Sequence, residues 1–145
     1  ERTMKIKEIM TPDVTIASPK DTLQKAAQLM EENDFGLLPV GDGERLVGML
    51  SDRDITVRGV ARGKAPDQCT VGEVMSDDVK YVYEDETLED ASRNMSELQV
   101  RRLPVLNPKK RLVGIISLGD LALNAKDNAG KALKDVSEPT GQSAA

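Results

Sequence analysis

The chain contains no histidine and no tryptophan, and its 145 residues include one cysteine and one phenylalanine. Without histidine there is no His general base, no Ser-His or Cys-His nucleophile and no His-ligated zinc. The single cysteine, Cys69, can form neither an internal disulfide nor a thiolate metal cage. An aromatic content of 2% argues against a stacking platform for single-stranded nucleic acid. We therefore expect no catalytic residues and no metal ligands.

The charge is mild and no long apolar run is present. Twenty basic and 25 acidic residues give a net charge of −5, and the one basic cluster, Lys109–Arg111, falls in an expected turn. A nucleic-acid binder normally shows a basic excess on one face. No apolar run approaches the roughly 20 residues that span a bilayer, and residues 1–4 do not resemble a signal peptide. We expect a cytoplasmic protein that binds neither nucleic acid nor membrane.

The sequence is a tandem duplication. When residues 75–105 are aligned with residues 10–40, 11 of the 31 positions are identical. After one extra residue in the following turn, Arg45–Gly48 matches Arg111–Gly114. Ser51 and Asp54 then match Ser117 and Asp120. Repeats must be found before any other assignment, because each copy predicts one structural unit.

Each copy predicts the order strand, helix, strand, strand, helix. A helix opens at Thr22, with Leu23, Ala26, Ala27 and Met30 on its apolar face, and its counterpart opens at Thr87. Apolar runs separated by turn residues predict the strands. The expected strands are Val14–Ile16, Leu37–Val40 and Leu46–Leu50 in the first copy, and Val79–Val82, Leu103–Leu106 and Leu112–Ile116 in the second. The expected last helices are Ser51–Arg62 and Ser117–Lys126.

A unit of about 55 residues rarely holds a core alone, because the buried fraction falls with size. We therefore expect an α/β (α+β) protein in which two βαββα repeats pack sheet to sheet with pseudo-twofold symmetry and two clefts between them. The predicted boundaries are 4–62 for the first repeat, 63–70 for a linker and 71–126 for the second repeat. Residues 127–145 are expected to form a C-terminal helix or tail that is partly flexible.

Both copies carry a serine followed three residues later by an aspartate, where a strand meets the last helix. Helix capping alone explains this pair, since serine is a preferred N-cap and an acid suits the positive end of the helix dipole. The same geometry also offers backbone N–H groups and a hydroxyl to a phosphate, and a carboxylate to a ribose diol. Both interpretations stay open at this point.

In combination, these motifs resemble paired cystathionine β-synthase (CBS) domains, a tandem known as a Bateman module. The resemblance rests on Met-Thr or Met-Ser near each start, Leu-Pro-Val before each turn and Gly-x-x-Ser-x-x-Asp at each last helix. It covers roughly residues 4–126 and extends to small stand-alone bacterial CBS-pair proteins. The family implies regulatory binding of AMP, ADP, ATP or S-adenosylmethionine without catalysis, and a homodimer formed through the last helices.

The resemblance also implies which residues would bind the ligand. Asp54 and Asp120 would hold ribose hydroxyls, and Ser51 and Ser117 would contact phosphate or ribose. The backbone around Thr15-Ile16 and around Lys80-Tyr81 would flank the base. Arg102, two residues before the strand proline, would bind phosphate.

The two copies differ at this set. Leu37 stands where the second copy has Arg102, and Arg53 stands where the second copy has Gly119. Arg53 either meets a phosphate or covers the neighbouring acids. We therefore expect unequal sites in a module that senses an adenine nucleotide and signals to a protein partner. The alternative is a dimeric interaction module without a physiological nucleotide, in which Ser and Asp are helix caps only.

Overall fold

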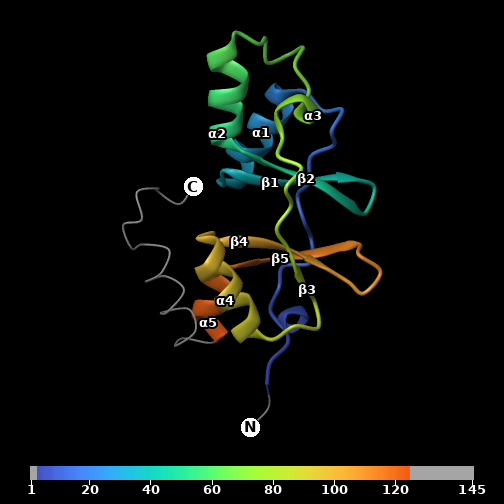
Figure 1. Cartoon of the computed structure of the whole chain (residues 1–145), viewed down its shortest axis with the longest axis vertical. Coiled ribbons are helices and arrows are strands. Elements are labelled where there is room, and N and C mark those ends of the chain that lie inside the picture. The colour runs from blue at the N-terminus through green and yellow to red at the C-terminus, as the bar shows by residue number, and fades with distance from the viewer. Residues whose placement is uncertain (1–2, 125–145) are drawn as a thin grey trace. The chain divides into compact units, whose positions relative to one another are not determined.

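The computed structural model describes residues 3–124, which form two compact units. Unit 1 contains the chain up to Val14 and from Lys80 onward, and unit 2 contains Thr15–Val79. The predicted C-terminal helix or tail, and the end of the second last helix, lie outside the described residues. The chain is a mixed α/β protein, as the sequence predicts, with a small sheet in each unit (Figure 1).

Unit 2 is built on an antiparallel hairpin that helices cover on one side (Figure 1). The expected helix and the two hairpin strands are confirmed, whereas the last helix changes from α-helical to π-helical and then to 3₁₀ geometry. In chain order the elements are α1 (Leu23–Asn33), β1 (Leu37–Asp42), β2 (Arg45–Ser51), α2 (Asp52–Asp54), the π-helical η2 (Ile55–Gly59), the 3₁₀ turn η3 (Val60–Arg62) and α3 (Val71–Val74).

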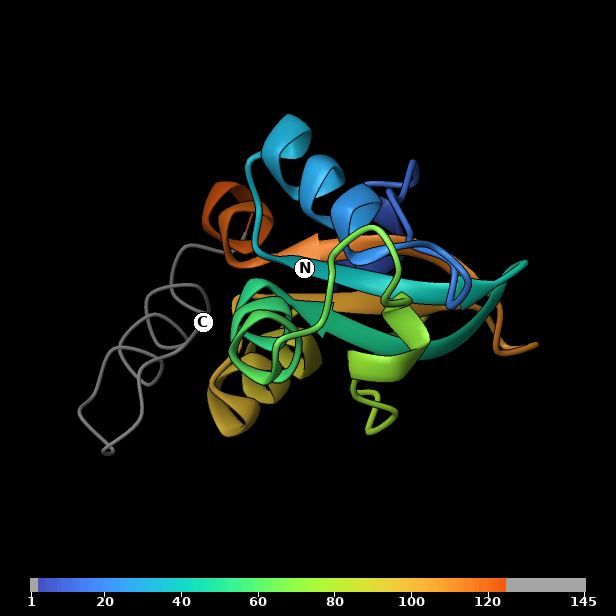
Figure 2. The ribbon, with the colours of Figure 1, turned by 90° about the horizontal axis from the view of Figure 1, so that it is seen from above.

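Unit 1 repeats this arrangement. Its sheet has the strand order β3-β4-β5, with β3 parallel to β4 and β4 antiparallel to β5. The elements are the 3₁₀ turn η1 (Ile6–Glu8), β3 (Val82–Tyr83), α4 (Leu88–Leu98), β4 (Arg102–Leu106), β5 (Leu112–Ser117) and α5 (Leu118–Asn124). Seen from above, the strands of each hairpin run side by side (Figure 2).

Threonine caps fix where the two long helices begin. The Thr22 hydroxyl accepts from the Lys25 amide at 3.1 Å, and the Thr87 hydroxyl accepts from the Asp90 amide at 3.1 Å. The predicted apolar face of α1 is buried at Leu23, Ala26 and Met30, and that of α4 at Leu88, Ala91 and Met95. The inclusion of Ala27 in that face is wrong, because Ala27 is exposed.

The predicted strands Val14–Ile16 and Val79–Val82 are wrong for most of their length, and the proline of each Leu-Pro-Val motif explains why. Ala17 bridges β1, donating to the Pro39 carbonyl at 3.0 Å and accepting from the Gly41 amide at 2.8 Å. Pro39 has no N–H to bond the chain further upstream, so the ladder stops. In unit 1, Pro104 occupies the same register position, and β3 begins only at Val82.

The starts of the two repeats are exchanged between the units. We call residues 4–14 and 69–79 the lead-in segments. The first lead-in belongs to unit 1, where Ile6 is fully buried among residues of the second repeat. The second lead-in belongs to unit 2, where Val71 and Val74 are fully buried. The packing units therefore cross the repeat boundaries predicted at residues 4–62 and 71–126.

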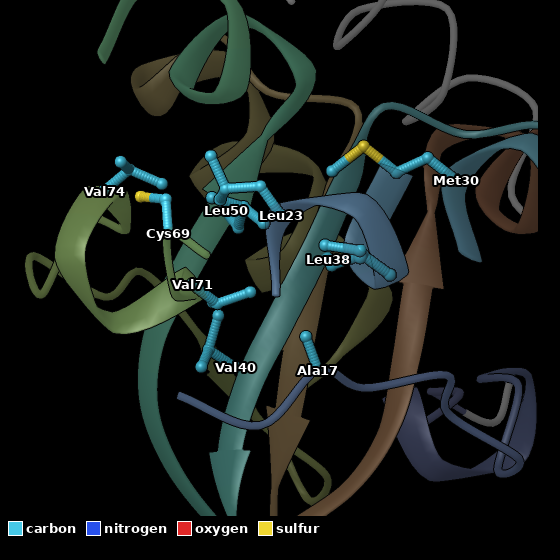
Figure 3. Packing of buried hydrophobic residues seen from close by; sticks show 10 residues of the cluster. Ala17, Leu23, Met30, Leu38, Val40, Leu50, Cys69, Val71 and Val74 are labelled. Atoms are coloured by element: carbon cyan, nitrogen blue, oxygen red, sulfur yellow. The ribbon is translucent and has the colours of Figure 1, made fainter. Parts of the chain in front are cut away.

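Equivalent backbone bonds hold the two lead-ins. Leu88 donates to the Met4 carbonyl at 3.3 Å in unit 1, and Leu23 donates to the Cys69 carbonyl at 3.0 Å in unit 2. Cys69, expected in a linker, is thus a buried member of the unit 2 core, and Figure 3 shows it beside Val74 and Leu50. Burial raises the pKa of its thiol above the ordinary value.

Candidate functional site

The serine and aspartate of each motif bond to each other. In unit 2, Asp54 N–H donates to Ser51 Oγ at 3.0 Å and Ser51 N–H donates to Asp54 Oδ2 at 2.8 Å. In unit 1, Asp120 N–H donates to Ser117 Oγ at 3.1 Å and Ser117 N–H donates to Asp120 Oδ2 at 2.8 Å. Both pairs are capping boxes, so the capping interpretation is confirmed.

Capping leaves hydrogen-bonding capacity on these side chains. A carboxylate has about four lone-pair positions, and the capping bond occupies one of them on Oδ2. A serine hydroxyl that accepts a bond at Oγ keeps its own proton to donate. Ser51, Asp54, Ser117 and Asp120 are all half-buried, so each side chain retains some exposure. Capping and ligand binding are therefore compatible at each pair.

Register brings the start of one hairpin strand to each serine. Arg102 pairs with Ser117 across β4 and β5, and Leu37 pairs with Ser51 across β1 and β2. The predicted difference between the repeats is thus located directly beside the motif: an arginine in unit 1 and a leucine in unit 2. Arg102 is half-buried at this edge.

The predicted base-flanking residues approach the same sheet end. Thr15 and Ile16 precede Ala17, which runs parallel to β1, so they lead toward the Leu37 end where Ser51 pairs. Lys80 and Tyr81 precede Val82, which runs parallel to β4, and lead toward the Arg102 end. In each unit one dipeptide and one Ser/Asp pair of the predicted set therefore lie toward the same end of the strands.

An aromatic pair distinguishes the unit 1 dipeptide. The rings of Tyr81 and Tyr83 meet edge to face with their centroids 5.5 Å apart. A hydrogen bond with Tyr81 and partial burial raise the pKa of the Tyr83 hydroxyl. The equivalent positions in unit 2 are Ile16 and Ser18, which carry no ring.

The charges beside the two Ser/Asp pairs also differ. Arg53 is exposed, and its backbone N–H bonds to Asp52 Oδ1 at 2.8 Å. The cation near Asp54 is Arg58, whose Nη1 lies 4.0 Å from Asp54 Oδ1 and 3.4 Å from the Met75 carbonyl. Sequence analysis missed Arg58, although its position four residues after Asp54 is a known helix pairing distance.

The glycine of each Gly-x-x-Ser-x-x-Asp motif has a packing role. A Cβ added at Gly114 would lie 2.5 Å from the sulfur of Met10, and one at Gly48 would lie 2.6 Å from the sulfur of Met75. A methionine within each lead-in thus covers the strand that carries the other repeat's Ser/Asp pair. Because only glycine leaves this space, the motif joins a packing requirement to a candidate binding pair.

The comparisons with known proteins identify the family. The family model described as CBS domain matches twice, at residues 6–58 and 71–126. The chain belongs to the CBS domain family. It is 44% identical over 134 residues to the CBS domain-containing protein YhcV of Bacillus subtilis, covering 91% of this chain and 94% of YhcV.

Two further CBS proteins are similar to this CBS pair. Hypoxic response protein 1 of Mycobacterium tuberculosis is 42% identical over 124 residues, covering 85% of this chain and 86% of that protein. The crystal structure of Hypoxic Response Protein I, with two coordinated zinc ions, covers 83% of this chain and 98% of its own at a TM-score of 0.73. The structure of CBSX2 in complex with AMP is 28% identical, covering 85% and 96% at a TM-score of 0.72.

The structure of Hypoxic Response Protein I contains two coordinated zinc ions, but the residues of this CBS pair do not fit such a site. The chain has no histidine and one cysteine, which is buried. Within residues 3–124, no three Cys, Asp or Glu side chains gather as metal ligands.

Over the same range, no helix is both long and apolar enough to cross a membrane.

Proposed function

We propose that this CBS pair is a regulatory module that binds an adenosine-containing nucleotide, such as AMP, ADP or ATP, and has no catalytic activity of its own. The observation that carries the proposal is that one Ser/Asp pair and one dipeptide lie toward the same end of the strands in each unit. The AMP complex of CBSX2, a structural neighbour, supports the choice of ligand class.

In this proposal Asp54 and Asp120 accept hydrogen bonds from ribose hydroxyls through carboxylate positions that capping does not use. Ser51 and Ser117 donate their hydroxyl protons to a ribose or phosphate oxygen. The backbone of Thr15–Ile16 and of Lys80–Tyr81 flanks the base, because the ladder beside each dipeptide ends at a proline.

The phosphate is expected to favour unit 1. Arg102 lies opposite Ser117 there, whereas Leu37 lies opposite Ser51 in unit 2. In unit 2, Arg53 is the exposed cation next to the motif, and Asp52 beside it carries the opposite charge. An arginine offers a planar set of donors that matches a phosphate, which leucine cannot replace.

Signalling would follow from linkage. A nucleotide shifts the conformation of the module only as far as its affinities for two conformations differ. The last helices follow the Ser/Asp pairs directly and would move with the ligand. They would also form a homodimer, since Val57 and Val60 of unit 2 and Leu123 of unit 1 are large apolar side chains that are exposed. A protein partner would then respond to the occupied state.

The test is thermal unfolding of the full chain with AMP, ADP, ATP, NAD or S-adenosylmethionine, with and without magnesium. A ligand at 100 times its Kd stabilises by about 2.7 kcal/mol, which raises the Tm by several degrees. Asp54→Ala and Asp120→Ala should each reduce that shift while lowering the stability itself by about 0.3–1 kcal/mol, and the double variant should remove the shift. Curves that all overlay the ligand-free curve at millimolar ligand would refute the proposal.

Asp90→Ala is the matched control. Asp90 forms the same reciprocal capping box with Thr87, with bonds of 3.0 and 3.1 Å, but stands at the start of α4 and outside the candidate site. This variant loses a cap and should keep the nucleotide shift. If Asp120→Ala and Asp90→Ala weaken the shift equally, Asp120 acts as a cap only.

The second candidate function is a dimeric interaction module without a nucleotide. The exposed valines and leucine of the last helices favour it. The double variant Val57→Asp/Val60→Asp should then convert the dimer to a monomer in sedimentation equilibrium. Neither the wild type nor this variant should show a nucleotide-dependent shift of the Tm. A wild-type chain that sediments as a monomer would exclude both this candidate and the homodimer.

A further inference from the structure

Each lead-in segment is bonded within one unit, and the chain that follows it continues into the other unit. Thr11 and the β5 residue Ile115 exchange two backbone hydrogen bonds of 2.9 Å in unit 1. Beyond the end of this lead-in, Ala17 bonds to Pro39 and Gly41 of β1 in unit 2. The intervening residues 12–16 include Thr15 and Ile16, the dipeptide of the unit 2 site.

The second lead-in makes the reciprocal connection. Ser76 and the β2 residue Met49 exchange two backbone hydrogen bonds of 2.8 Å in unit 2. Beyond the end of this lead-in, the chain enters β3, where Val82 pairs with Val105 of β4 in unit 1. The intervening residues 77–81 include Lys80 and Tyr81, the dipeptide of the unit 1 site.

The bonded residues lie close to the Ser/Asp pairs. Ile115 precedes Ser117 by two positions on β5, and Met49 precedes Ser51 by two positions on β2. The dipeptide of each site is thus connected, through one lead-in, to the strand that carries the serine of the other site. The backbone therefore provides a continuous path from each of these strand ends to the dipeptide of the other unit.

Each crossing stretch is short and follows a closely packed methionine. Met10 covers Gly114 and Met75 covers Gly48 so closely that no Cβ would fit at either glycine. Five residues span at most about 18 Å when fully extended, so the stretches 12–16 and 77–81 are short. In unit 2, Arg58 adds a side-chain connection between Asp54 and the Met75 carbonyl of the second lead-in.

We propose that the exchanged lead-ins couple the two candidate sites, so that a nucleotide bound in one unit changes the affinity of the other unit. The proposal rests on the proposed function for its ligand. The coupling itself is carried by backbone bonds that exist without ligand, so it can also be tested without nucleotide.

The ligand experiment is calorimetric titration with AMP. For independent sites, the wild-type isotherm equals the sum of the isotherms of Asp54→Ala and Asp120→Ala. Coupling predicts that the wild-type isotherm departs from that sum. The affinity of at least one site in the wild type should then differ about fivefold or more from its affinity in the variant that keeps only this site. Agreement within twofold would overturn the proposal.

Lengthening a crossing stretch should remove the coupling. A Gly-Gly insertion between Asp77 and Asp78, both exposed, should bring the wild-type isotherm to within twofold of the independent sum. The matched control is a Gly-Gly insertion after Gly43, in the exposed turn between β1 and β2, where a Cβ would meet no atom within 4 Å. The control should retain the full coupling, because that turn connects two strands of one unit.

Hydrogen exchange provides the ligand-free experiment. Ile6→Ala opens the unit 1 core, and coupling predicts that exchange at the unit 2 amides of Ala17 and Gly41 accelerates by the same factor as in unit 1. In the chain lengthened at Asp77, the acceleration should remain in unit 1. Acceleration confined to unit 1 in the original chain would overturn the proposal even if AMP binds. If AMP does not bind at all, the proposed function fails and this exchange pattern still decides whether the units are coupled.

Discussion

Unit 1 and unit 2 repeat the same backbone bonds at equivalent positions but present different side chains at their Ser/Asp edges. The bonds of Leu118 to the Arg101 carbonyl and of Asp52 to the Gly36 carbonyl, both 2.8 Å, occupy the same place after the serine. Yet the first joins an apolar and a basic residue, whereas the second joins an acid and a glycine. Exposed positions at this edge have therefore diverged while the backbone geometry stayed the same.

The glycine at position 36 illustrates how closely the side chains of unit 2 fit one another. A Cβ at Gly36 would lie 2.6 Å from Asp52 Oδ2, so the acid and the glycine depend on each other. Unit 1 has Arg101 and Leu118 at the equivalent positions and no such restriction. In unit 2, the residues at these two positions therefore depend on each other, so their divergence from unit 1 is paired.

The largest expected effects concern Ile6 and Val71, the fully buried side chains at equivalent positions of the two lead-ins. Ile6→Ala removes a fully buried side chain of unit 1 and should lower the free energy of unfolding by about 2–5 kcal/mol. Val71→Ala, at the equivalent position of unit 2, removes two methyl groups and should cost about 1.5–3 kcal/mol. Urea denaturation measures both values. Gln28→Ala, at an exposed residue of α1 outside the proposed dimer face, is the control and should change stability by less than about 0.5 kcal/mol.

The next effect compares the two methionine–glycine contacts. Gly48→Ala and Gly114→Ala overpack their sites and should each cost about 1–3 kcal/mol, with similar costs in the two units. Each new Cβ would also meet a backbone carbonyl, that of Ser76 at 2.9 Å for Gly48 and that of Thr11 at 3.0 Å for Gly114, and neither carbonyl can rotate away as a methionine can. Urea denaturation of single and double variants tests this equivalence.

Double variants sharpen the same comparison. Adding Met10→Ala to Gly114→Ala, or Met75→Ala to Gly48→Ala, should relieve only part of the strain, because the Thr11 or Ser76 carbonyl remains. Gly119→Ala is the control: its Cβ would meet nothing nearer than Ser117 Oγ at 3.6 Å, so this substitution should cost no stability. Full relief in either unit would contradict the role given to the two carbonyls.

Caps and apolar spacing along the sequence predicted the helices and hairpin strands of both units. The duplication made it impossible to predict in which unit each lead-in packs. The caps at Thr22 and Thr87 and the apolar spacing of the helices were enough to predict α1 and α4. Because both lead-ins carry the same apolar spacing, the first could pack in its own repeat or in the other. Periodicity is identical in the two cases, so only three-dimensional structure distinguishes them.

The candidate site was partly predictable for a similar reason. The Ser/Asp pairs follow from residues three positions apart, and their capping bonds form as expected. The truncated strands could have been foreseen from Pro39 and Pro104, since proline cannot donate to a ladder. The contact of Arg58 with the Met75 carbonyl joins residues 17 positions apart, and no local pattern predicts it.

A smaller effect compares the first turns of α4 and α1. Asp90→Ala should lower stability by about 0.3–1 kcal/mol at pH 7, because the carboxylate accepts from the Thr87 amide and suits the helix dipole. Lys25, at the equivalent position in α1, pairs with Asp21 at 3.3 Å on an exposed surface, so Lys25→Ala should change stability less. Urea denaturation between pH 7 and pH 3 measures both variants.

The pH dependence has a definite sign. The Thr87 backbone N–H holds the pKa of Asp90 below its ordinary value. A group whose pKa is lower in the folded state stabilises fully above its unfolded pKa, which is about 3.9 for aspartate. The stability difference between wild type and Asp90→Ala should therefore be constant from pH 7 to about pH 5. It should then shrink as the pH falls through the folded pKa, and a difference that grows in acid would contradict this account.

The smallest expected effect concerns an ion pair that unit 1 has and unit 2 lacks. Lys7 Nζ lies 2.9 Å from Asp85 Oδ1, and this hydrogen bond raises the pKa of Lys7. The equivalent positions in unit 2 are Gly72 and Lys20, which cannot pair. The two side chains are 50% and 54% exposed, so water competes for both charges and salt screens their attraction. Lys7→Gln should leave the urea midpoint unchanged at 0.5 M NaCl and lower it slightly at low salt. A loss that persists at 0.5 M NaCl would mean that the stem of Lys7 packs against η1, and Lys7→Met, which keeps that stem, would then restore the midpoint.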